Sequence, residues 1–331
     1  MEALKAAIWG SIGLAIAISL SGCSSAPSAS TLSIRTHGRT SGYPAELDPV
    51  SGVALASSAM PGAALYRLDY WSRGLKVEGY LIVPPGSGPF SLIVSLHGGD
   101  MFGDDVFGSP YHFNGYPAWN AQRAAGNADF NHAVVFLPNF AGYGGSQGNV
   151  GSPYSEYIDT VNGMVALRRI RGLDLSRQTY VVGASVGGLI ALLLASKDTY
   201  VRALLLDSPY VGAQFVSDWL QQHDTSALSV GDLTIMADYV RMYGESVAGK
   251  PYQENSPNYC AIRIPVLIIA GTRDPYYPVA MLKDATSRLR KCDPTVTLRV
   301  FPGGHAPSSV AVNNAEWTWA VSHFRGTVHN P

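Results

Sequence analysis

Along most of this chain, short and almost continuous apolar runs alternate with longer stretches of mixed polarity. The apolar runs are Leu92–Leu96, Ala133–Leu137, Tyr180–Val182, Val201–Leu206, Val266–Ala270 and Val296–Val300. Such runs are typical of strands buried on both faces of a parallel sheet. The stretches of helical length between them are Ala118–Ala125, Tyr157–Ile170, Val186–Ser196, Ala280–Leu289 and Asn313–Phe324. This alternation predicts an α/β fold, in which ligands bind beyond the carboxyl ends of the strands.

Two earlier segments show a period-two pattern of apolar and polar residues. They are Ala64–Tyr70 and Leu75–Val83, and the turn Ser72-Arg73-Gly74 lies between them. Period-two alternation around a short polar turn predicts an antiparallel hairpin. We expect Pro84-Pro85-Gly86 to end it.

One segment, residues 209–259, is too long for an ordinary connection between two strands of such a sheet. It contains two amphipathic pieces, Gln214–Gln222 and Leu233–Tyr243, together with many aromatic residues. We interpret it as a helical cap inserted over the active site. The alternative is a pair of surface helices that does not contact substrate.

The N-terminal residues 1–23 have the pattern of an export signal. Lys5 precedes the apolar stretch Ala6–Leu20, which is shorter than the roughly 20 residues of a membrane span. Leu20-Ser21-Gly22-Cys23 then resembles the bacterial lipobox, which implies that Cys23 is lipidated and becomes the new N-terminus. An uncleaved anchor helix or an ordinary secretory signal is the alternative.

We therefore expect an exported lipoprotein that is attached to a membrane by an N-terminal lipid anchor. If the source is a Gram-negative bacterium, Ser24 after the cysteine implies the outer membrane, or at least the periplasmic face of a membrane. Residues 24–62 are rich in Ser, Ala, Gly and Pro, and predict a tether with an irregular lead-in to a catalytic domain at 63–326.

Export leaves two cysteines, Cys260 and Cys292, in an oxidising compartment. Each precedes an apolar strand by a few residues. If these strands are parallel neighbours, both thiols lie at the same edge of the sheet. We predict a disulfide between them, and two buried, unpaired thiols are the alternative.

Composition narrows the choice of partners. With 331 residues, of which 47% are hydrophobic, the chain can bury one large core. A formal net charge of −1 gives no electrostatic footprint for nucleic acid. No His, Cys or carboxylate cluster has metal-site spacing, and no Gly-rich phosphate loop carries a lysine. We expect no metal, no cofactor and no nucleic-acid partner.

The strongest chemical signal is Gly183-Ala184-Ser185-Val186-Gly187-Gly188, which directly follows the apolar run ending at Val182. A serine between glycines, after a strand and before a helical stretch, predicts the sharp turn that exposes a nucleophilic hydroxyl. The pattern alone occurs by chance in Gly-rich chains, so the assignment depends on finding its partners.

A serine nucleophile of this type needs an acid and a histidine later in the chain, each in a loop after a strand. Asp274 follows Val266–Ala270, and His305 follows Val296–Val300. We expect His305 to take the proton from Ser185, and Asp274 to fix the imidazole tautomer. The rival acid is Asp207, and the rival histidines are His223, His323 and His329.

An oxyanion site is predicted from His97-Gly98-Gly99, which follows the strand Leu92–Leu96. Glycines let backbone N–H groups approach a carbonyl oxygen. We expect the N–H groups of Val186 and Gly99 to be the two donors. A plain turn is the alternative interpretation of these glycines.

Taken together, these motifs resemble those of an α/β-hydrolase, and more narrowly the catalytic domain of the prolyl oligopeptidase family. The likeness extends from Tyr66 to Phe324. It includes Gly79–Pro84, His97-Gly98-Gly99, Pro138-Asn139, Gly142, Gly144, Asp159, Gly183–Gly188, Ser256-Pro257, Pro265–Gly271, Asp274 and His305. The resemblance implies a mostly parallel sheet of eight strands with helices on both faces, and a triad of Ser185, Asp274 and His305.

Some positions depart from the family. Ala141 stands where an arginine is frequent, and Asp100 stands where a proline is common. The stretch before Ala64 is too short for the β-propeller that usually screens substrates in the family's peptidases. These departures leave the triad intact and weaken the inference of peptidase specificity.

We therefore expect a serine hydrolase that forms an acyl-enzyme from a small-molecule ester or a short peptide. The triad cannot separate the two substrates, because the chemistry up to the acyl-enzyme is shared. Acyl transfer to an alcohol or amine is also compatible with it. The alternative from another class is a catalytically silent scaffold that acts as a binding lipoprotein.

Overall fold

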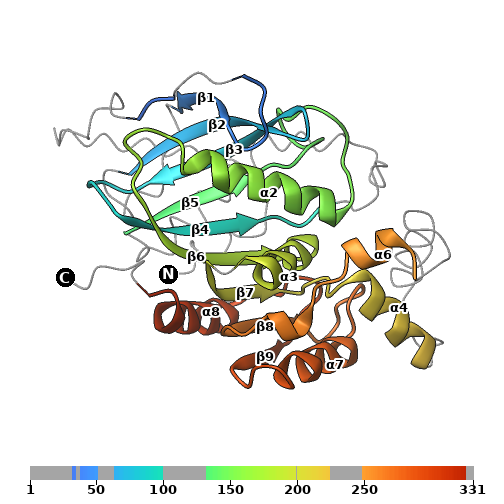
Figure 1. Ribbon diagram of the computed structural model, residues 1–331. Coiled ribbons are helices and arrows are strands. Elements are labelled where there is room, and N and C mark those ends of the chain that lie inside the picture. Colours follow the sequence, from blue (N-terminus) through green and yellow to red (C-terminus); the bar gives the residue numbers. More distant parts are fainter. Residues whose placement is uncertain are drawn as a thin grey trace, which may run out of the picture.

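The computed structural model describes residues 32–34, 38–50, 63–99, 132–198, 200–223 and 248–325. In these residues, nine strands form one sheet in the order β1-β2-β3-β5-β4-β6-β7-β8-β9 (Figure 1). The strands are β1 (Pro44–Pro49), β2 (Ala64–Ser72), β3 (Leu75–Val83), β4 (Phe90–Leu96), β5 (Ala133–Pro138), β6 (Leu175–Ala184), β7 (Val201–Asp207), β8 (Val266–Gly271) and β9 (Val296–Phe301). The pairs β1–β2, β2–β3 and β3–β5 are antiparallel, and the remaining pairs are parallel.

The sheet has one strand more than the expected eight. The additional strand, β1, lies in the segment predicted to be irregular, and its register runs from Pro44 opposite Tyr70 to Pro49 opposite Tyr66. Prolines at both ends suit an edge strand, which is paired on one side only. Its single large apolar side chain, Leu47, packs partly against the core, so the period-two signal in the sequence is weak.

Helices cover both faces of the sheet. They are α2 (Pro153–Leu167), α3 (Val186–Lys197), α4 (Ala213–Gln222), α6 (Lys250–Glu254), α7 (Val279–Arg290) and α8 (Val310–His323). Apolar side chains of α2, α3 and α7 belong to one buried cluster, and those of α8 to a second cluster on the opposite face. Figure 1 shows α2 crossing in front of the sheet. None of the described helices has the length and apolar content that a membrane crossing requires.

The predicted cap is described only in part. Its first amphipathic piece, Gln214–Gln222, is helical in α4, whereas Leu233–Tyr243 and the predicted helix Ala118–Ala125 lie outside the described residues. A hydrogen bond of 2.8 Å from Trp219 Nε1 to Asp284 Oδ2 joins α4 to α7. The cap over the active site stays a prediction.

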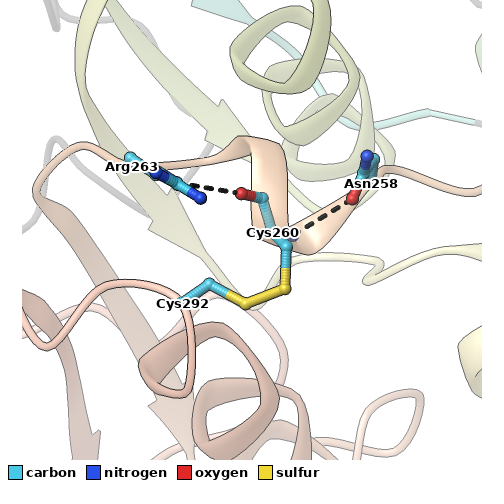
Figure 2. The surroundings of a disulfide bond; sticks show 4 residues. All are labelled: Asn258, Cys260, Arg263 and Cys292. Atoms are coloured by element: carbon cyan, nitrogen blue, oxygen red, sulfur yellow. Dashed lines mark hydrogen bonds between the residues drawn. A yellow bond between two sulfur atoms is a disulfide. The ribbon is translucent and has the colours of Figure 1, made fainter.

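A disulfide joins the segments that precede β8 and β9, the last two strands of the sheet (Figure 2). Cys260 lies in the short 3₁₀ helix Tyr259–Ala261, before β8, and Cys292 follows α7, before β9. Because β8 and β9 are parallel neighbours, both cysteines lie at the edge where these strands begin. Their sulfur atoms are bonded, as the sequence predicts.

We expect replacement of both cysteines by alanine to lower the free energy of unfolding. The crosslink closes a loop with a sequence separation of 32, for which chain entropy gives about 4 kcal/mol. Urea unfolding of the Cys260→Ala/Cys292→Ala variant measures the loss. The wild-type protein with a reductant is the matched control, and it should unfold at the midpoint of the variant. Equal midpoints for the variant and the oxidised wild type would contradict the prediction.

Candidate active site

Ser185 lies in a sharp turn between the last residue of β6 and the first residue of α3, with backbone angles φ 53° and ψ −119°. A side chain on Gly183 would place its Cβ 2.4 Å from the carbonyl oxygen of Gly187, and one on Gly187 would lie 2.4 Å from that of Leu96. The turn therefore needs glycine at both positions. The Ser185 N–H donates to the Asp207 carbonyl at 3.0 Å, and the Ser185 carbonyl accepts from Tyr210 N–H at 2.8 Å.

Asp274 and His305 form a hydrogen-bonded pair in the loops that follow β8 and β9. The distance from His305 Nδ1 to Asp274 Oδ2 is 2.9 Å, and the Asp274 carboxylate is fully buried. Its other oxygen accepts from the backbone N–H groups of Tyr276 at 2.9 Å and Tyr277 at 3.1 Å. Burial alone would raise the pKa of Asp274, but the bond and charge of His305 and these two N–H groups outweigh it and lower the pKa. The carboxylate is therefore ionised at neutral pH and can orient the imidazole.

Ser208 connects the histidine loop to the serine turn. Its hydroxyl accepts from Ala306 N–H at 3.0 Å, and its own N–H donates to the Ile269 carbonyl at 2.9 Å. The preceding residue, Asp207, supplies the carbonyl that holds the Ser185 N–H. The ends of β6, β7, β8 and β9 thereby place Ser185, Asp274 and His305 on one edge of the sheet.

The rival residues have other surroundings. His305 Nδ1 meets Asp274, while Asp207 contributes its backbone carbonyl to the serine turn. His223 and His323 each donate from Nδ1, at 2.8 Å, to the carbonyl of the tryptophan four residues earlier in the helix, and each stacks on that indole ring. His329 lies outside the described residues.

The glycines of the predicted oxyanion loop lie against the nucleophile. A Cβ on Gly98 would be 3.0 Å from Ser185 Cβ and 3.6 Å from its Oγ. A Cβ on Gly99 would be 2.5 Å from the Tyr143 hydroxyl oxygen. Val186 is the first residue of α3, so its N–H has no acceptor within the helix. Asp100 lies outside the described residues.

His97, the residue before these glycines, is a buried structural element. Its Nδ1 donates to the Gly98 carbonyl at 2.6 Å, and its ring packs between Phe140 and Tyr143, with centroids 4.5 and 4.9 Å away. Burial lowers the pKa of His97 to about 4. The imidazole is therefore neutral at physiological pH and fixes the backbone that leads into the oxyanion loop.

A buried charge network, which the sequence analysis did not find, supports the loop carrying Phe140 and Tyr143. Asp159 is fully buried and accepts from Arg73 Nε at 3.0 Å, Arg73 Nη2 at 2.9 Å and Ala141 N–H at 3.0 Å. The guanidinium that binds Asp159 comes from the β2–β3 turn. Position 141 carries alanine and contributes only its backbone N–H. Arg73 and Asp159 are 86 residues apart, and no local pattern links them.

The described residues contain no group of three His, Cys, Asp or Glu side chains arranged to hold a metal ion. Cys23, the predicted lipidation site, lies outside them.

Comparison with known families and structures places this arrangement in context. The model of a family described as "Alpha/beta hydrolase family" matches residues 93–317. No curated protein sequence matches the chain significantly.

Many solved structures resemble this chain at low sequence identity. An esterase of Pyrococcus furiosus is 19% identical, with a TM-score of 0.53 over 85% of this chain and 95% of that one. An acetyl xylan esterase from a Paenibacillus species is 17% identical, with a TM-score of 0.58 over 84% and 88%. An acylaminoacyl peptidase of Pyrococcus horikoshii is 17% identical, with a TM-score of 0.52 over 72% of this chain but 37% of that one. At identities this low, the structural similarity shows a shared fold and nothing more.

We expect His97 to make the folded protein sensitive to acid. Burial lowers the pKa of His97 to about 4 in the folded protein, whereas its ordinary pKa is about 6.5. Between these two pH values the unfolded chain binds a proton at His97 and the folded protein does not. The free energy of unfolding should therefore fall by about 3 kcal/mol as the pH drops from 6.5 to 4.

The matched variant is His97→Gln, whose amide retains a donor for the Gly98 carbonyl and does not titrate. Urea unfolding across this pH window should give a steeper decline for the wild type than for the variant. Parallel declines would show that His97 titrates normally in the folded protein.

Proposed function

Because the chain belongs to the alpha/beta hydrolase family, we propose that it is an exported serine hydrolase in which Ser185, His305 and Asp274 form the catalytic triad. The observation that carries this proposal is the 2.9 Å hydrogen bond from His305 Nδ1 to the buried Asp274 carboxylate, on the sheet edge that carries Ser185. The left-handed backbone of Ser185 supports it, because strain of this kind concentrates at functional positions.

In the proposed reaction, Ser185 Oγ attacks the substrate carbonyl while His305 Nε2 takes the hydroxyl proton. The negative oxygen of the tetrahedral intermediate accepts from the N–H groups of Val186 and Gly99, each of which would contribute about 3 to 4 kcal/mol. Collapse passes the proton from His305 to the leaving group and forms the acyl-enzyme. Water then attacks this ester, with His305 as base again, and releases the acid.

For the substrate, we propose a small carboxylic ester. The two esterases resemble this chain over 95% and 88% of their own lengths, whereas the acylaminoacyl peptidase does so over 37% of its length. A short peptide bond is the competing substrate. The lipobox-like residues ending at Cys23 support export and a lipid anchor.

Ser185→Ala should lower kcat/KM for a p-nitrophenyl acyl ester by about 10⁴-fold or more, because it removes the attacking oxygen. Asp274→Asn should lower it by about 10⁴-fold, since the amide favours the wrong imidazole tautomer. Asp207→Asn is the matched control at the rival acid. Full activity of folded Ser185→Ala would overturn the assignment.

An aminoacyl anilide measured beside the ester decides between the two substrates. We expect ester cleavage without anilide cleavage. Anilide turnover that is lost in Ser185→Ala would make the protein a peptidase, because the site must then protonate an amine leaving group. Silence of the folded wild type on both would favour the binding scaffold.

A double variant tests the oxyanion loop. Gly99→Ala should lower kcat by about 10² to 10³-fold, because the added methyl would lie 2.5 Å from the Tyr143 hydroxyl and displace the Gly99 N–H. Adding Tyr143→Phe removes that hydroxyl. Gly99→Ala should therefore lower kcat less when it is made in Tyr143→Phe than when it is made in the wild type. If Gly99→Ala leaves kcat unchanged, the Gly99 N–H is not an oxyanion donor.

A further inference from the structure

The edge where the parallel strands begin, opposite the triad, carries a cluster of exposed arginines. They are Arg168, Arg171, Arg177, Arg202 and Arg325, which we call the basic edge. None of the five forms an ion pair with another described residue. The loops between them carry two carboxylates, Asp174 and Asp198, and Asp198 accepts the Tyr200 N–H at 2.7 Å. The cations therefore outnumber the anions on this surface.

Shared contacts group four of these arginines into two pairs. The guanidinium groups of Arg168 and Arg177 lie 5.8 and 5.7 Å from the same Tyr200 ring, which is 39% exposed. Arg202 and Arg325 line one pocket of about 320 Å³. Two guanidinium forks that have no ion pair among the described residues line this pocket, and such forks match the geometry of phosphate oxygens.

The first described residues of the chain, 32–34, lie on this same edge. Leu32 packs against the core, and Ser33 pairs with Arg171 through two backbone hydrogen bonds of 3.2 and 2.9 Å. Ten residues lead from Cys23 to Ser33, and they reach at most about 35 Å when fully extended. A compact domain of this size is on the order of 50 Å across. A lipid on Cys23 would therefore attach the domain near the basic edge, through a tether too short for the triad edge to contact the bilayer.

We propose that the basic edge docks on the phosphate headgroups of an anionic bilayer, so that the triad edge faces away from the membrane. The proposal rests on the proposed lipidation of Cys23. It joins two independent features, the attachment point at Arg171 and the surrounding arginines, which form no ion pair with another described residue. In this orientation the site receives esters from the aqueous compartment and not from the lipids of the anchoring leaflet.

Two fluorescent probes on the mature lipidated protein test this orientation. Cys260 and Cys292 are paired and Cys23 carries lipid, so one introduced cysteine is the only free thiol. Ser322→Cys places the dye at the pocket of the basic edge, and Thr272→Cys places it at the carboxyl end of β8. The vesicles contain phosphatidylglycerol in phosphatidylcholine, with a nitroxide quencher on the headgroups.

We expect quenching at Ser322→Cys to exceed that at Thr272→Cys at least threefold. The ratio should fall in phosphatidylcholine alone, at 0.5 M NaCl, and when Arg177, Arg202 and Arg325 are all changed to Gln, because only the lipid tether then positions the domain. The matched control changes the exposed arginines Arg39, Arg273 and Arg299 to Gln, and should keep the ratio. Equal quenching of both probes, or a ratio insensitive to the first triple variant, would overturn the proposal.

Two further measurements separate the possible failures. Mass spectrometry of the N-terminal peptide reports lipidation directly. If Cys23 is not acylated, sedimentation of the protein with anionic vesicles decides: arginine-dependent binding supports docking, and absence of binding overturns it. If the first triple variant instead abolishes self-association in sedimentation velocity, the edge is an interface between copies and the docking proposal is wrong.

Discussion

The left-handed backbone at Ser185 is the constraint around which the catalytic edge is arranged. Such a conformation costs an L-residue on the order of 1 to 2 kcal/mol, so neighbouring segments must impose it. They do so through the Asp207 carbonyl and the Tyr210 N–H, and through glycines that let β6, α3 and the end of β4 approach within contact distance. Phe140, Ser208 and Ala306 also have positive φ. The strain is therefore distributed over the loops that surround one hydroxyl.

Much of this arrangement could be predicted because it follows from local patterns. Continuous apolar runs indicate buried parallel strands, and polar residues directly after them lie at one edge of the sheet. Asp274 and His305 are predictable from that position together with their order in the chain after Ser185. The start of α2 was readable too: Ser152 caps it and Pro153 follows, yet the apolar pattern placed the start at Tyr157.

Other features could not be predicted, because they depend on contacts between distant segments. Strand β1 has little apolar signal, because Leu47 is its single large apolar side chain. The bond between Arg73 and Asp159 requires the β2–β3 turn to lie over α2, which no short motif specifies. Nothing in the sequence around Asp159 indicates that its guanidinium partner is Arg73, from another element.

The disulfide has a consequence for strand alignment. Cys260 and Cys292 tie β8 and β9 together where they begin, and the same two strands carry Asp274 and His305 where they end. If β9 slid by one residue along β8, its side chains would exchange faces, and the imidazole would leave its carboxylate. The crosslink between the segments before these strands limits such sliding. The disulfide at one end of the strand pair thus helps to keep the acid and the base aligned at the other end.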